Sequence, residues 1–120
     1  MAKAVDDTVL DGALNIIDNT TRMVACSGQP ANFAGIAAVA LADVVMAPGD
    51  FTDANGDTNG RKVTVAAKSG VSVDTNGTAT HVSMDDGTTL LYVTTCTSQV
   101  LTAGNTVNFP AWDIEIADPT

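Results

Sequence analysis

GTATHVSMDDGTTLLYVTTC, residues Gly77 to Cys96, holds two runs rich in valine and threonine on either side of the dipeptide Asp86-Gly87. Valine, threonine and tyrosine favour β-strands. An Asp-Gly dipeptide tolerates the positive φ angles that the tight primed turns of β-hairpins require. The segment therefore predicts an antiparallel hairpin, and with it an antiparallel sheet.

Short strands and turns continue on both sides of this hairpin. Asn76-Gly77 predicts a second hairpin by the same turn chemistry. The segments RKVTV and WDIEI alternate apolar and polar residues, which is typical of strands with one buried and one solvated face. Pro110 cannot donate to a strand ladder, so it places the last strand at an edge or a bulge. Together these patterns predict a mainly β fold, an antiparallel β-sandwich or barrel, with its β-body over residues 22–116.

One amphipathic α-helix is predicted at the N-terminus, over residues 6–19. In DDTVLDGALNIIDN the apolar residues recur at three- and four-residue spacings, and the aspartates lie largely on the other face. Asp6 or Asp7 can cap the helix, whereas Gly12 weakens it by up to about 1 kcal/mol relative to alanine. The helix therefore depends on docking, and we expect a single domain over residues 1–120 with the helix laid across an end or face of the β-body.

The composition describes an acidic protein with few aromatic residues. Fourteen acids stand against five Lys and Arg, which gives a formal net charge of −9, and aromatic residues make up 4%. Such a surface repels a phosphate backbone, so we expect no nucleic-acid partner. The N-terminus lacks the apolar run of a signal peptide, and FAGIAAVALADVVMA is too short for a membrane span. These features predict a protein made in the cytosol with no membrane partner.

The segment GDFTDANGDTNGR, residues 49–61, begins like a calcium loop. Asp53, Asn55, Asp57 and Asn59 are its candidate oxygen ligands, but no register from this run supplies the glutamate that closes an EF-hand at position twelve. A strand pattern also follows where an EF-hand needs a helix. We therefore interpret the segment as an exposed turn, long enough to project and contact a subunit, and keep as the alternative a weak ion site completed by another subunit.

The remaining reactive residues do not form a catalytic motif. His81 is the only histidine, and no nucleophile elbow accompanies it. Asp85 and Asp86 are adjacent carboxylates, but neighbouring turn residues project in different directions. Cys26 and Cys96 are interpreted as small buried hydrophobic residues in preference to a disulfide. We therefore expect no enzymatic activity and no cofactor.

The order of several segments resembles a family of small virion structural proteins from tailed bacteriophages. The segments are DDTVLDGALNIIDNTTRMVACSGQPANF, DTNGRKVTV, GTATHVSMDDGTTLLYVTT and LTAGNTVNFPAWDIEIADP, which span nearly the whole chain. The resemblance implies a non-enzymatic virion protein, foremost a capsid cement or decoration protein that binds the major capsid protein as a homo-oligomer. It assigns no functional residue. A tail, neck or fibre-attachment component is the alternative within the particle, and a carbohydrate-binding module or small hydrolase using the acidic segment with Asp85 and Asp86 is the alternative from another class.

Overall fold

Antiparallel β-strands are the main elements of the protein, as the sequence predicts. The computed structural model describes residues 5–118. Its helical elements are α1 (Asp7–Ile17), η1 (Phe33–Gly35), α2 (Ile36–Val39) and η2 (Pro48–Asp50). Its strands are β1 (Arg22–Cys26), β2 (Ala40–Val45), β3 (Phe51–Asn55), β4 (Arg61–Val65), β5 (Lys68–Ser72), β6 (Gly77–Asp85), β7 (Leu90–Leu101), β8 (Thr106–Phe109) and β9 (Trp112–Ile116).

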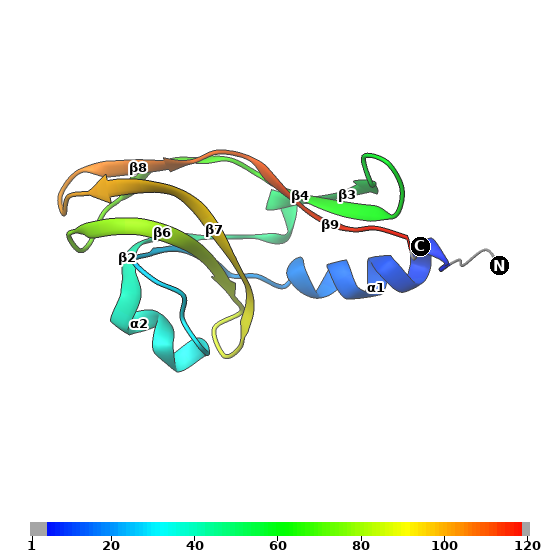
Figure 1. Cartoon of the computed structure of the whole chain (residues 1–120), viewed down its shortest axis with the longest axis horizontal. Coiled ribbons are helices and arrows are strands. Elements are labelled where there is room, and N and C mark those ends of the chain that lie inside the picture. Colours follow the sequence, from blue (N-terminus) through cyan, green and yellow to red (C-terminus); the bar gives the residue numbers. More distant parts are fainter. Residues whose placement is uncertain (1–4, 119–120) are drawn as a thin grey trace.

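The strands form three sheets that are arranged in two layers. One layer is a four-stranded sheet in the order β2-β1-β6-β7. The other layer contains the sheets β3-β4-β9 and β5-β8, which follow each other along the chain because β5 comes soon after β4 and β9 soon after β8. Figure 1 shows α1 extending the first layer beyond the four-stranded sheet, so that it lies under β3, β4 and β9. The molecule is therefore elongated, with extents of 54 × 25 × 24 Å.

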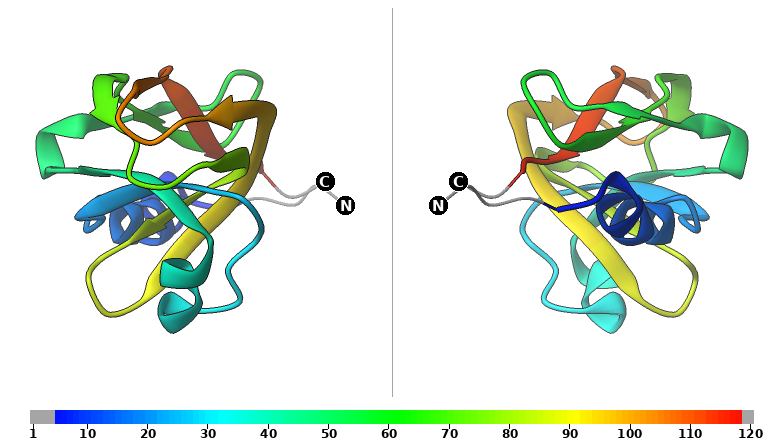
Figure 2. Two further views of the ribbon diagram at one scale, coloured as in Figure 1. Left: turned by 90° about the vertical axis from the view of Figure 1, so that its left-hand side faces the viewer. Right: turned by 90° about the vertical axis from the view of Figure 1, so that its right-hand side faces the viewer.

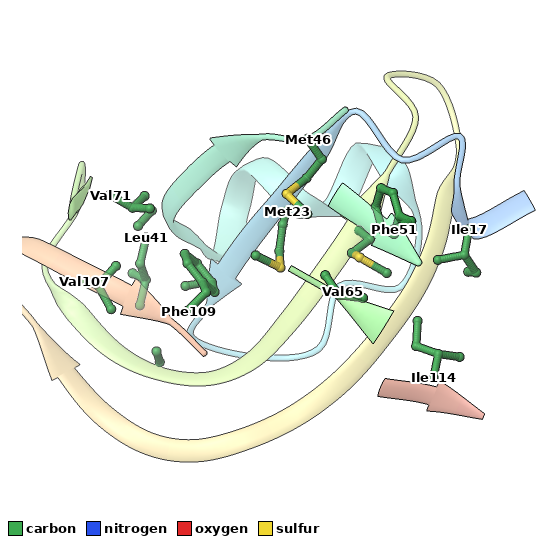
Figure 3. Close-up of a cluster of buried hydrophobic side chains, with 14 of the residues drawn as sticks. Ile17, Met23, Leu41, Met46, Phe51, Val65, Val71, Val107, Phe109 and Ile114 are labelled. Atoms are coloured by element: carbon green, nitrogen blue, oxygen red, sulfur yellow. The ribbon is translucent and has the colours of Figure 1, made fainter. Parts of the chain in front are cut away.

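A core of small aliphatic residues, methionines and two phenylalanines fills the space between the layers. Phe51 and Ile114 lie at one end of this core, and Leu41 and Phe109 lie at the other (Figure 3). The side chain of Met23 lies between the two groups and is fully buried. Flexible thioethers fill irregular gaps well, which suits a core that must join two differently shaped ends.

Helix α1 docks through a single line of residues. Leu10, Leu14 and Ile17 recur at positions i, i+4 and i+7 and are buried against the body. Asp6 caps the first turn, because its carboxylate accepts a hydrogen bond from the Thr8 amide at 2.8 Å. A 2.7 Å ion pair from Arg61 Nε to Asp11 Oδ1 fastens the helix to β4. Figure 2 shows the helix end-on beneath the strands of the other layer.

The two predicted hairpins have different outcomes. β6 and β7 pair antiparallel, which confirms the hairpin at Asp86-Gly87. Its loop spans residues 86–89, and only Gly87 has a positive φ, of 92°, so the connection is not a two-residue primed turn. The Asp86 carboxylate instead organises the loop by accepting hydrogen bonds from the amides of Thr88 and Thr89.

The hairpin predicted at Asn76-Gly77 is wrong. β5 pairs with β8, and the chain passes through Asn76 from one layer to the other. The Asn76 amide oxygen accepts a hydrogen bond from the Ala103 amide at 2.7 Å, so its side chain ties two connections together. Gly77 leaves room for Leu41, since a Cβ there would lie 2.8 Å from Leu41 Cδ2 and would require that side chain to shift.

Candidate interaction surfaces

The acidic segment is a hairpin and not one long loop. Its first half forms β3, which pairs antiparallel with β4 and buries Phe51, so the true turn covers only residues 56–60. This corrects the interpretation of the whole segment as a projecting turn. The local composition does not predict β3, because its only buried residue is accompanied by aspartate, asparagine and threonine. The ladder supplied by β4 decides its conformation.

Three of the four candidate oxygen ligands of this hairpin are directed to partners within the protein. Asn55 Oδ1 accepts a hydrogen bond from Arg61 at 2.8 Å, and Asn59 Oδ1 accepts one from the Asp118 amide at 2.9 Å. Asp57 Oδ1 lies 2.7 Å from Lys62 Nζ. Asp53 is exposed on β3, opposite Val63. Within residues 5–118, no group of three or more His, Cys, Asp or Glu side chains is placed to hold a metal ion.

Asp85 and Asp86 lie in different surroundings and do not act as a pair. Asp85 is 1% exposed at the end of β6, where its carboxylate accepts a hydrogen bond from Arg22 Nε at 3.0 Å and another from the Gly87 amide. Asp86 lies in the loop, and hydrogen bonds from Thr88 and Thr89 lower the pKa of its carboxyl. The first carboxylate joins β1 to the hairpin, and the second shapes the loop.

The histidine and the cysteines are also dispersed. His81 is half-buried on β6, has Cys26 and Thr95 as its cross-strand neighbours, and lies 2.8 Å through Nδ1 from the Thr80 hydroxyl. Both thiols are free. Cys26 is fully buried, as predicted, and its burial raises the pKa of the thiol. Cys96 is exposed on β7, so the prediction that it is buried is wrong.

Within residues 5–118, the protein neutralises its cations and leaves many carboxylates free of ion pairs. Each of the four Lys and Arg side chains in the described part of the chain forms an ion pair with an aspartate. The pairs are Arg22 with Asp85 and Asp43, Arg61 with Asp11, Lys62 with Asp57 and Asp113, and Lys68 with Asp50. Hydrogen bonding to Lys68 and to the Ala47 amide lowers the pKa of Asp50. A surface with spare negative charge favours partners that bring positive charge.

Helix α1 presents a second apolar line to solvent, next to the one that docks. Val9 and Ile16 are 63% and 54% exposed, and Ala13 between them is also exposed. We call this line, Val9 with Ala13 and Ile16, the α1 stripe. The sequence pattern places both lines on one broad apolar face, but the body is wide enough to bury only one of them. Asp7, which has no ion pair with another residue of the described part of the chain, lies on the same helix.

Strand β7 forms a free edge of the four-stranded sheet. It pairs with β6 on one side, and no backbone hydrogen bond outside this ladder reaches residues 90–101 from the rest of the described chain. Val100 near its end is 75% exposed. A groove of about 260 Å³ runs beside it, lined by Val82, Thr94, Thr95, Phe109, Pro110 and Trp112. The ring of Trp112 lies 5.8 Å from that of Tyr92, beside this groove.

The sequence marks this edge by a long segment without charged residues, which is visible only when the segment is considered as a whole. Residues 87–112 contain no Asp, Glu, Lys or Arg in a chain that carries 14 acids. An uncharged run of this length marks a surface from which charge is excluded. The α1 stripe has no comparable signal, because only the width of the docking site decides which apolar line is buried.

Comparisons with known proteins return no relative. No protein-family model matches the chain, and no curated protein and no solved structure matches it. No helix among residues 5–118 is long and apolar enough to cross a membrane.

Proposed function

We propose that this chain is a non-enzymatic virion structural protein, a capsid cement or decoration protein that binds the outer face of the major capsid shell. The resemblance of its sequence to small phage virion proteins motivates the proposal. The α1 stripe is the observation that carries it, because a protein whose task is to bind other chains must keep apolar surface available in its isolated form.

The chemistry of the partner surface follows from the surroundings of the stripe. Helix α1 contains acidic residues and no basic residue, and Asp7 stands in its first turn. A complementary surface on the capsid protein would be apolar at its centre and basic at its rim. Such a partner would bury Val9 and Ile16 and bring positive charge to the unpaired carboxylates.

The composition of the particle tests the proposal. We expect purified virions that contain the chain to hold about one copy for each capsid subunit or for each capsomer, measured by quantitative mass spectrometry against the major capsid protein. A few copies at a single vertex would contradict a cement role and select a tail, neck or fibre component. A chain that is lost from the particle and binds immobilised glycans would instead select a carbohydrate-binding module.

Variants of the stripe test the docking surface itself. Ile16→Asp should weaken binding of the purified protein to undecorated capsid shells by ten-fold or more, since central interface residues carry most of the binding energy. Val45→Asp is the matched control, because Val45 is 79% exposed on β2 and is not part of the α1 stripe. Equal binding by both variants and the original protein would remove the α1 stripe from the contact.

A further inference from the structure

The free edge of β7 carries a second inference, which does not depend on the proposed virion role. We propose that two copies of this chain pair antiparallel through the outer edge of β7, along residues 91–95, about a two-fold axis at Val93. The two four-stranded sheets then form one continuous sheet across the dimer.

The other sheet edges carry features that discourage pairing, whereas β7 does not. β2, β3 and β9 hold acidic residues, and β5 begins with Lys68 and contains Gly70 at a φ of 67°. β8 is uncharged but only four residues long, and Pro110 follows it. β7 has twelve residues with no charge, proline or glycine. Natural sheets protect exposed edges with charges, prolines and short strands, so an unprotected long edge indicates a strand that is covered in the working protein.

Charge identifies the occupant as a second copy. Two chains with a formal net charge of −9 repel each other over most of their surfaces. The uncharged run of residues 87–112, which contains all of β7, is where two copies can meet without placing like charges together. A two-fold axis sets each β7 against an identical edge, so one contact satisfies both free ladders at once.

The ladder with β6 limits which part of β7 can pair. Thr95 is opposite His81 and Gln99 is opposite Ala79, so β7 holds two extra residues between these pairs. A bulge of this kind bends the strand and ends regular pairing. A second register shift, between Met84 and Asp85, leaves Leu91 without a partner on β6. The regular ladder of residues 92–95 therefore lies between the two shifts, beside the groove at Thr94 and Thr95.

The alternation of faces restricts the axis to the position of a residue, and Val93 is the central residue of the segment 91–95. Tyr92 packs on Trp112 and is opposite Met84 in the core, so it faces inward. Val93 is opposite the buried Ser83 and faces the other way. Directly opposite residues must share a face when a sheet continues across a two-fold axis normal to it. With the axis at Val93, each Val93 is opposite its counterpart and Leu91 is opposite Thr95 of the second copy.

The oligomeric state tests the pairing. We expect sedimentation equilibrium of the full chain to show a reversible dimer that strengthens as NaCl rises, because salt screens the repulsion between the two acidic bodies. Thr95→Glu places a charge at the edge and should weaken dimerisation at least ten-fold. Thr52→Glu adds the same charge at an exposed position of β3 and should leave dimerisation unchanged. Circular dichroism confirms that both variants are folded.

A cysteine at the axis tests the register. In a Cys96→Ser background, Val93→Cys should form an intermolecular disulfide on mild oxidation, because directly opposite residues have Cα atoms about 4.5–5.5 Å apart, within the range of a disulfide. Thr52→Cys in the same background should not cross-link, and Cys26 is buried. A chain that stays monomeric at all concentrations would overturn the proposal. So would a dimer that survives Thr95→Glu and gives no cross-link at Val93.

Discussion

At the scale of single residues, Gly60 ends the β3–β4 turn in a conformation that other residues rarely adopt. Its φ is 74°, and a Cβ at this position would overlap the Ile116 carbonyl oxygen of β9. Gly60→Ala should therefore lower the free energy of unfolding by about 1–3 kcal/mol, through backbone strain together with a steric clash. Urea unfolding monitored by Trp112 fluorescence measures the change.

A glycine with the opposite expectation is the matched control for Gly60. Gly12 lies in the middle of α1, and no atom lies within 4 Å of a Cβ built on it. Gly12→Ala should stabilise the protein by up to about 1 kcal/mol, because alanine loses less backbone entropy in a helix. Equal effects of the two substitutions would show that neither the turn conformation nor the contact with Ile116 limits position 60.

Asp18 is a carboxylate in an unfavourable place, and its effect on stability depends on pH. Desolvation and the nearby Asp53 raise the pKa of its carboxyl, and Oδ1 has no hydrogen-bond partner in residues 5–118. A carboxyl with a raised pKa in the folded protein favours folding when protonated, so this contribution is lost as pH rises through the folded pKa. Asp18 also stands at the C-terminal end of α1, where the helix dipole disfavours negative charge.

Asp18→Asn should accordingly stabilise the protein at neutral pH, by a few tenths to about 1 kcal/mol. The gain should fade below about pH 4, where the original carboxyl is itself protonated. Thermal unfolding at several pH values measures this effect. Asp7→Asn removes a charge from the favourable end of the same helix and should destabilise the protein at neutral pH. A gain from Asp18→Asn that does not change with pH would show that its charge is not the cause.

At the scale of elements, α1 depends on its docking line and not on its whole apolar face. Leu14 is 1% exposed, so Leu14→Ala should cost about 2–5 kcal/mol. Ile16→Ala should cost no more than about 0.5 kcal/mol, because Ile16 is 54% exposed and lies in the α1 stripe. Denaturant unfolding of the two variants compares the lines directly. Similar losses would mean that the stripe also packs against the body.

Local sequence predicts an element correctly where the cause of that element is also local. The hairpin at Asp86-Gly87 forms because its turn residues and both strands lie within one short segment. Asn76-Gly77 has the same turn chemistry, but Gly77 meets Leu41 of another strand and β5 finds its partner in β8. β3 likewise escapes prediction because only its pairing with β4 makes it a strand.

At the scale of the whole molecule, the mainly β class follows from strand and turn patterns, whereas the layering does not. The order of the strands along the chain does not predict that β4 and β5 belong to two different sheets of one layer. It also does not predict that α1 extends the other layer. The free edge of β7 depends on that layering, because a strand becomes an edge only when the remaining strands have found other partners. The sequence identifies the candidate ligands of the acidic segment. It does not identify the groups that bind three of them, because those groups lie on β4 and after β9, which only the fold brings beside these side chains.

Two opposing electrostatic effects decide how the stability of this acidic protein responds to salt. Salt weakens the ion pairs of the four described cations. The pairs on the surface contribute at most about 1 kcal/mol each, and the Arg22–Asp85 pair, whose carboxylate is buried, is screened less than the others. Salt also screens the repulsion among the excess carboxylates of a chain with a net charge of −9, which the folded state holds closer together than the unfolded state does. We expect the repulsion to dominate, because carboxylates without an ion pair are spread over the whole body.

Raising NaCl from low to moderately high concentration should therefore raise the Tm by roughly 3–6 °C, which corresponds to about 1 kcal/mol for a protein of this size. Differential scanning calorimetry on the Thr95→Glu variant isolates the effect from self-association, and a chloride salt avoids the separate stabilising effect of sulfate. A Tm that falls with added NaCl would show that the ion pairs outweigh the repulsion. The acidic surface would then stabilise the fold through these pairs.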